Sequence, residues 1–308
     1  MITDSTRSGS NKRVQAKARV KPHPAEIDNP RRPLGALEEN IPDRVWRFGV
    51  AGILLVAAVL RLWDLNLVPL HHDEGVNGNF LVRLVREGVY TYDPNNYHGP
   101  TLYYFSALIP WITRLLFGNS ARDTYGLTTF TIRLVPALFG LATIALVFLL
   151  RRKLGTIATL SAGLVLAISP GAVYLSRYFI HETLFVFFTL GIVVALVWFY
   201  EERNPSYLVP AGASAALLFA TKETAMISVA VLIIALVLTL IYTHFTRRQS
   251  VQITGKRNRP RHSNSRLSEL IYEMGGTTTV VGHLVVALIV FQGLYLLFYS
   301  SFFQNSKG

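Results

Sequence analysis

Cysteine is absent from this chain of 308 residues. Its absence excludes disulfides, thiolate metal sites and a cysteine nucleophile. The chain also lacks a glycine-rich loop that could cradle phosphates and the Gly-x-Ser-x-Gly turn of serine hydrolases, so a nucleotide-hydrolysing transporter and a serine hydrolase have no support. Charged residues make up only 16% of the chain, and they fall mainly between long uncharged runs.

Apolar residues are abundant instead. They make up 51% of the chain, the mean hydropathy is +0.36, and several apolar runs approach the roughly 20 residues that a helix needs to cross a bilayer. These features predict an all-α, polytopic membrane protein. The apolar runs that we interpret as spans, of which the fifth is short, cover residues 46–63, 132–150, 157–176, 183–200, 207–220, 225–245 and 280–300.

The topology depends on an eighth apolar run, residues 101–117, which contains Pro110 and Arg114. If it lies on the membrane surface, the basic blocks at 151–153 and 247–266 share one side with the basic N-terminus, as the positive-inside rule prefers. We therefore predict seven spans, a cytoplasmic N-terminus and a location in the cell membrane. The net charge of +12 is explained by this orientation, because the basic blocks lack the interleaved aromatics of a nucleic-acid surface.

This topology divides the chain into segments of different character. We expect a disordered basic cytoplasmic tail, a membrane core with one large extracytoplasmic loop at 66–130, a basic cytoplasmic loop, and a last span with a short tail. The tail, core, cytoplasmic loop and last span cover residues 1–44, 45–246, 247–279 and 280–308, respectively.

Polar residues with possible chemistry gather on one membrane face in this topology. In the large loop, apolar residues recur at helical spacing from Phe80 to Val85, which predicts an amphipathic surface helix with Asp73 and Glu74 at its N-terminus. The acids could serve catalysis or simply cap this helix. Two shorter loops contribute the remaining groups, which could also be snorkelling side chains at span ends: Arg177, His181, Glu182, Lys222 and Glu223.

Four short motifs follow the acidic pair Asp73 and Glu74 along the chain. They are HGPTLYY at 98–104, TIRLVPALFG at 131–140, SRYFIHE at 176–182 and TKE at 221–223. With the acidic pair after the first span and these motifs in this order, the sequence resembles the GT-C glycosyltransferases of the protein O-mannosyltransferase and aminoarabinose transferase type. The likeness is most marked for the subgroup called flippase-activity-associated membrane proteins, although the chain stops after its seventh predicted span and could be C-terminally truncated.

The resemblance implies a GT-C-like bundle that transfers a sugar from a polyprenyl-phosphate carrier to an acceptor hydroxyl at the extracytoplasmic face, with inversion. Asp73 would be the general base, while Glu74 and Glu182 would orient the acceptor or the base. Arg177 and Lys222 would bind the phosphate that leaves, and membrane lipids would surround the bundle. Two positions depart from the family pattern: Glu182, preceded by His181, stands where the family usually has an aspartate, and His98 stands where relatives often have a lysine. We place His98 and His181 at the substrate.

Two alternatives stay open from the sequence. The chain could be a non-catalytic membrane protein that assists the flipping or handling of polyprenyl-linked sugars, although the clear spans lack the midplane charge of many carriers. A divalent metal is also possible, since His71, His72 and the other predicted site residues form a pool of ligands. None of them falls in a zinc pattern, so we predict no required cofactor or metal.

Overall fold

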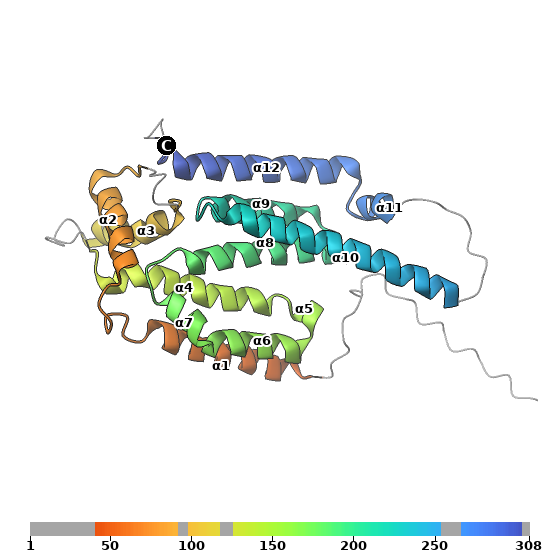
Figure 1. Cartoon of the computed structure of the whole chain (residues 1–308), viewed down its shortest axis with the longest axis horizontal. Helices are drawn as coiled ribbons and strands as arrows, with labels where there is room; N and C mark the ends of the chain where they lie inside the picture. Colours follow the sequence, from red (N-terminus) through yellow and green to blue (C-terminus); the bar gives the residue numbers. More distant parts are fainter. Residues whose placement is uncertain (1–40, 92–97, 118–125, 254–265, 304–308) are drawn as a thin grey trace, which may run out of the picture. The chain divides into compact units, whose positions relative to one another are not determined.

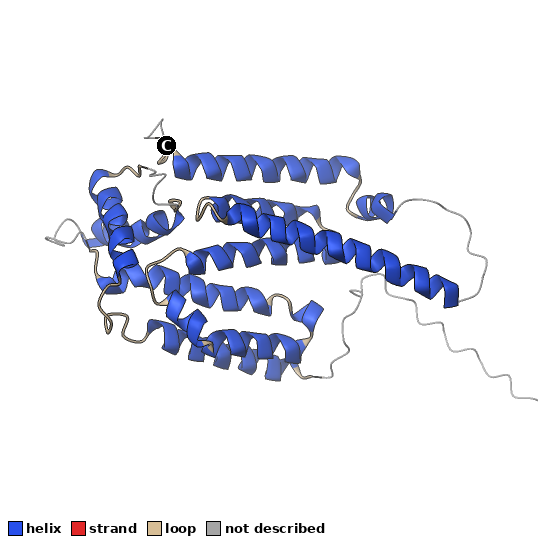
Figure 2. Cartoon of the chain, in the orientation of Figure 1, coloured by secondary structure: helices blue, strands red, loops and turns tan. Residues whose placement is uncertain are grey.

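A computed structural model describes residues 41–91, 98–117, 126–253 and 266–303. All of them belong to one compact unit, Pro33–Gly308. Helices joined by loops and turns make up this part of the chain (Figure 2), which confirms the predicted all-α class. The predicted tail at 1–44 lies outside the described residues except for its last four positions.

The helices follow the predicted apolar runs closely. Several boundaries differ by up to three residues, and one differs by more: the run at 225–245 continues as a helix to Ile253, inside the predicted basic loop. The elements are α1 (Asp43–Leu62), α2 (His72–Glu87), α3 (Thr101–Phe117), α4 (Thr129–Phe148), α5 (Arg151–Leu154), α6 (Thr156–Ile168), α7 (Pro170–Ser176), α8 (Glu182–Glu202), the 3-10 turn η3 (Pro205–Tyr207), α9 (Leu208–Phe219), α10 (Ala225–Ile253), α11 (Arg266–Glu273) and α12 (Thr277–Tyr299).

Five described helices are long and apolar enough to cross a membrane: α1, α4, α8, α12 and residues 225–243 of α10. The predicted third span is broken, because α6 and α7 meet at 61° where Pro170 opens α7. The predicted fifth span corresponds to the shorter apolar helix Pro205–Phe219. The seven predicted spans are thus all helical, but by length and composition the described residues contain five spans, or six if the bent pair counts as one.

Neighbouring helices pack in the order α1–α6–α4–α8–α9–α12, as Figure 1 allows the reader to follow. Apolar side chains of α10 and α12 remain largely exposed, as expected for surfaces that face lipid. The main core lies where α2, α3, α8 and α9 meet, and it is rich in aromatic rings, among them Tyr90, Tyr103, Phe179 and Phe188.

The predicted large loop contains α2 and α3, which lie together at one end of the long helices (Figure 1). The amphipathic helix that we predicted is α2, with its apolar residues Leu81, Leu84 and Val85 buried. The sequence analysis placed residues 101–117 on the membrane surface, but Tyr103 and Tyr104 are buried at the start of α3. They pack on other aromatic rings of the core instead of reaching the membrane surface.

The basic residues of α5 mark the opposite end of the bundle. Arg151 pairs with Asp43 at the start of α1, and Arg152 pairs with Glu202 at the end of α8. Because α4 runs from the α2 end to α5, these ion pairs lie at the far end from α2 (Figure 1). The segregation is the one that a seven-span, positive-inside topology predicts, and the orientation itself stays a prediction.

Candidate functional site

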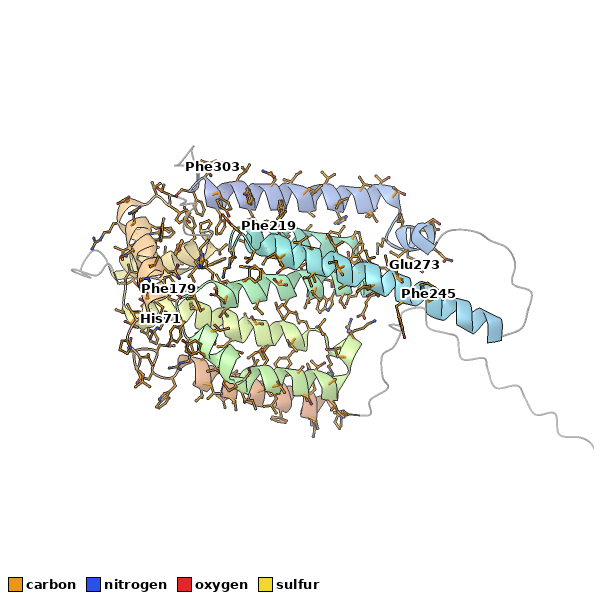
Figure 3. The ribbon with its side chains drawn as sticks, viewed as in Figure 1. His71, Phe179, Phe219, Phe245, Glu273 and Phe303 are labelled. Atoms are coloured by element: carbon orange, nitrogen blue, oxygen red, sulfur yellow. The ribbon has the colours of Figure 1, made fainter. Side chains whose placement is uncertain are left out.

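A buried ion pair holds the N-terminus of α2, near His71 and Phe179 in Figure 3. The Glu74 carboxylate accepts hydrogen bonds from Arg133, with Nε at 2.7 Å from Oε1 and Nη2 at 2.6 Å from Oε2. The backbone N–H groups of His71 and Phe179 donate to the same carboxylate, each at 2.9 Å. Burial raises the pKa of Glu74, but these hydrogen bonds outweigh it and hold the pKa below its ordinary value. This filled shell of donors favours a positioning role for Glu74.

Arg133 ties this ion pair to the segment between α1 and α2. Its Nη1 donates to the carbonyl oxygens of Leu65 and Val68, at 2.7 and 2.8 Å, and its Nη2 donates to that of Pro69 at 3.1 Å. We quoted Arg133 within a family motif but gave it no role. An arginine inside an apolar run is the signal that could have singled it out, since such residues are costly unless they are paired.

Asp73 has the opposite environment from its neighbour Glu74. Its side chain is 66% exposed, and its carboxylate Oδ2 lies 3.7 Å from Nδ1 of His71, the N-cap residue of α2. The backbone N–H of Asp73 donates to the same ring nitrogen at 3.3 Å. Asp73 is therefore an open carboxylate on a rigid helix start, where a ligand from outside can reach it.

Arg177 is bound to the C-terminal end of α1. Its Nη1 donates to the carbonyl oxygens of Leu60 and Trp63, at 2.9 and 2.7 Å, and its Nη2 donates to that of Asp64 at 3.0 Å. Leu60 and Trp63 lie at the end of α1 and Asp64 just after it, so the guanidinium caps the helix. A phosphate could bind both terminal nitrogens only by displacing these contacts, and the phosphate role implied for Arg177 stays a prediction.

A second polar group forms where the start of α3 meets the turn between α9 and α10. His98 and Lys222 form an isolated antiparallel bridge, and the Gly99 N–H donates to the Thr221 carbonyl at 3.0 Å. Glycine is required at 99, because a Cβ atom there would overlap the carbonyl group of Ala220. The bridge therefore brings two predicted substrate residues together from positions more than 120 residues apart.

Charged and titratable side chains meet at this bridge. Lys222 Nζ lies 2.8 Å from Oε1 of Glu182, and both side chains are partly exposed. The ring of His98 lies edge-on to that of the buried His181, with centroids 4.6 Å apart. Burial, and secondarily the nearby His98, lowers the pKa of His181 well below its ordinary value, so its ring is neutral at physiological pH. The predicted residues His98, His181, Glu182 and Lys222 thus form one cluster, which we call the Lys222 cluster.

A chain of buried contacts links the Lys222 cluster to the start of α2. Tyr103 donates its hydroxyl hydrogen to Oδ1 of Asn77 at 2.9 Å, and Nδ2 of Asn77 donates to the Phe179 carbonyl at 3.0 Å. The Tyr103 ring lies 5.2 Å from that of His181. The sequence analysis did not single out Asn77 and did not place Tyr103 in the candidate site, since neither shows a distinctive pattern. They hold both parts of the candidate site at the same end of the bundle.

Metal binding finds no support in this geometry. Within the residues that the structure describes, no three histidine, aspartate or glutamate side chains are grouped so that they could hold a metal ion. The buried His98 and His181 nitrogens without a hydrogen-bond partner belong to a pair of rings with a lysine beside it. Nε2 of the neutral His181 ring meets the Gly99 carbonyl and so carries the hydrogen, which leaves its Nδ1 as an acceptor for a substrate hydroxyl.

Comparisons with known proteins agree with the resemblance seen in the sequence. Residues 104–254, a little under half of the chain, match the family model described as dolichyl-phosphate-mannose-protein mannosyltransferase. No curated protein sequence matches the chain.

Among solved structures, the chain is similar to the S. cerevisiae protein O-mannosyltransferase Pmt1-Pmt2 complex bound to the sugar donor. The sequence identity is 18%, the TM-score is 0.53, and the match covers 86% of this chain and 34% of that chain. The chain thus spans about a third of the length of the solved protein. The subgroup and the truncation that we considered stay predictions. The chain therefore shares the fold of this membrane protein O-mannosyltransferase, a GT-C type glycosyltransferase, and its central residues match the mannosyltransferase family model.

Proposed function

We propose that this protein transfers a sugar from a polyprenyl-phosphate donor to an acceptor hydroxyl, with inversion, at the extracytoplasmic face of the membrane. The observation that carries the proposal is the contrast between two adjacent acids. The Glu74 carboxylate accepts hydrogen bonds from an arginine and two backbone N–H groups, whereas the Asp73 carboxylate, at the same helix start, is exposed to solvent. Such a pair provides one acid that builds the site and one that is free for chemistry.

Asp73 is the proposed general base. As the acceptor oxygen attacks the anomeric carbon, Asp73 takes its proton, the new carbon–oxygen bond forms, and the bond to the carrier phosphate breaks with its electron pair on the phosphate oxygen. Base catalysis of this kind typically contributes about 10² to 10⁴ in rate. The Glu74–Arg133 pair keeps the base in place, which is what proximity effects require.

The Lys222 cluster is the proposed donor-phosphate site. The Lys222 ammonium has three N–H donors and engages Glu182 with one of them, so it can also meet a phosphate oxygen that gains charge as the bond breaks. His98 stands beside it across the bridge, and His181 stays neutral. The second oxygen of Glu182, buried without a hydrogen-bond partner, could accept a hydrogen bond from a substrate hydroxyl and so orient it.

The distribution of charge supports the extracytoplasmic placement. Arg151, Arg152 and Lys153 lie at the end of the bundle opposite α2, where the positive-inside rule puts the cytoplasm. The similar yeast structure is bound to its sugar donor, and a lipid-linked sugar as the partner of this chain agrees with that.

The test is sugar transfer in membranes from a labelled polyprenyl-monophosphate sugar, with Asp73→Asn and Asp64→Asn at matched expression. Asp64 is an exposed acid on the same side, in a left-handed conformation that asparagine adopts readily. We expect transfer to fall by about 10² or more in Asp73→Asn and to be retained in Asp64→Asn. Equal transfer by the original and Asp73→Asn contradicts the proposed base. No transfer by the original, with donor binding intact, would instead favour a protein that handles the lipid-linked sugar.

A further inference from the structure

The residues that follow α12 reach across to the first-loop elements. Ser301 is fully buried, and its Oγ accepts a hydrogen bond from the Tyr90 N–H at 2.6 Å. The same Oγ lies 2.6 Å from the Tyr104 hydroxyl, which supplies its second hydrogen bond. Phe302 adds a ring contact, with its centroid 4.9 Å from that of Tyr104. The end of the last helix is thus joined to elements more than 190 residues earlier in the chain.

The backbone at this contact is strained. Ser301, Phe302 and Phe303 have φ angles of 53°, 55° and 66°, so three consecutive residues with side chains lie in the left-handed region. Such conformations persist only where the surroundings impose them, and they cluster at sites with a function. The two hydrogen bonds to Ser301 and the Phe302 ring contact hold these residues in that conformation.

A short path leads from Ser301 to the Lys222 cluster. Tyr90, held at its N–H by Ser301, donates its hydroxyl hydrogen to the His98 carbonyl at 3.3 Å. The backbone of His98 is therefore held in two ways. It pairs with Lys222 of the α9–α10 turn in the bridge, and its carbonyl accepts the hydrogen bond from Tyr90. Tyr90 is itself buried against Tyr103, which fixes where its hydroxyl can lie.

We infer that Ser301 is a positioning residue of the proposed transferase, which acts through Tyr90 to set the place of His98 beside Lys222. This inference rests on the proposed function, in which the Lys222 cluster binds the donor phosphate. Ser301 does not touch the substrate. The Ser301 hydroxyl fixes the position of the Tyr90 backbone, and Tyr90 in turn positions His98 on the donor side of the site. Asp73 on α2 is held separately, through the ion pair between its neighbour Glu74 and Arg133. Donor affinity and the chemical step therefore depend on different contacts.

The experiment measures the donor KM, kcat and the dissociation constant of a photoreactive polyprenyl-phosphate sugar, together with the melting temperature in detergent. The variants are Ser301→Ala, Tyr90→Phe, which removes only the hydroxyl that meets His98, and Tyr104→Phe, which removes only the other partner of Ser301. The adjacent Ser300→Ala is the control, since its hydroxyl accepts a local hydrogen bond from the Phe303 N–H.

We expect Ser301→Ala and Tyr90→Phe each to weaken donor binding and raise the donor KM by about threefold to tenfold, the effect of one hydrogen bond, with kcat nearly unchanged. Because both changes act along one path, the double variant is expected to match the larger single effect rather than their product. Tyr104→Phe and Ser300→Ala are expected to change donor binding by less than about twofold, although they can lower the melting temperature.

A Ser301→Ala variant that melts earlier but binds donor normally would reduce Ser301 to a structural role and overturn the inference. If that variant fails to fold, Tyr90→Phe decides alone, because it keeps the contact to Ser301. Unchanged donor binding in Tyr90→Phe, or multiplicative effects in the double variant, would also overturn the inference. Failure of the original chain to bind donor or transfer sugar would instead overturn the proposed function, on which the inference depends.

Discussion

The two ends of the helix bundle use charge in opposite ways. At the α2 end, the side chains of Arg133 and Glu74 are 3% and 0% exposed and meet in paired hydrogen bonds. At the α5 end, those of Arg152 and Glu202 are 73% and 35% exposed and share a single contact of 2.9 Å. An exposed pair stabilises little, whereas a buried pair is costly to break. The first end therefore holds a fixed arrangement of side chains, whereas the ion pair at the second end contributes little to stability.

Removing one partner of the buried pair should have the largest effect. Arg133→Met leaves Glu74 as an unpaired buried carboxylate, which typically costs about 3 to 5 kcal/mol of stability. Chemical denaturation in detergent measures the change in the free energy of unfolding. Arg152→Met at the other end is the matched control. Similar losses for both variants would contradict the difference between the two ends.

Closing the space at the bridge should have the next largest effect. Gly99→Ala pushes the His98 segment away from Ala220, and overpacking of this kind costs about 1 to 3 kcal/mol. Donor binding should weaken along with stability, because the Lys222 cluster is assembled at that bridge. The control is Gly78→Ala, where a Cβ meets open space within α2 and should stabilise by about 0.5 to 1 kcal/mol. A Gly99→Ala variant that binds donor normally would show that the bridge is dispensable.

Acid should loosen the α2 end in two stages. Burial lowers the pKa of His181 well below 6.5, so the unfolded chain binds a proton that the folded chain refuses, and stability falls as the pH drops below about 6.5. Glu74 also has a lowered pKa, so its contribution is present above its ordinary value of 4.5 and is lost only as the pH falls below that value. Melting temperatures recorded from pH 8 to 4 test this order. No decline between pH 6.5 and 5 would contradict the neutral, buried state of His181.

The smallest effect is expected at the α5 end. Arg152→Gln removes an exposed ion pair and should change the free energy of unfolding by less than about 1 kcal/mol, an effect that salt screens further. Sugar transfer should be unaffected, because α5 lies far from the Lys222 cluster. Denaturation at low and high salt, together with a transfer assay, provides the measurement. A large loss of transfer would mean that the two ends are coupled.

The sequence predicted the helices better than the tertiary contacts between their side chains. Apolar runs predicted the long helices, and helical periodicity predicted α2, because both are local patterns. Nothing local distinguishes Asp73 from Glu74, since the difference arises from Arg133, 59 residues away. Likewise, the family resemblance implied a phosphate role for Arg177, but its guanidinium donates to carbonyl oxygens at the end of α1. The bridge between His98 and Lys222 also depends on tertiary packing that no periodicity reports.

The central claim is that Asp73 performs the chemistry while the Lys222 cluster binds the donor. The most direct test measures donor binding and sugar transfer in the same membranes for Asp73→Asn and Lys222→Gln. We predict that Asp73→Asn binds donor like the original chain but loses transfer by about 10² or more, whereas Lys222→Gln weakens donor binding by about tenfold or more. Normal transfer by Asp73→Asn, or a loss of donor binding in it as large as in Lys222→Gln, would contradict this division of roles.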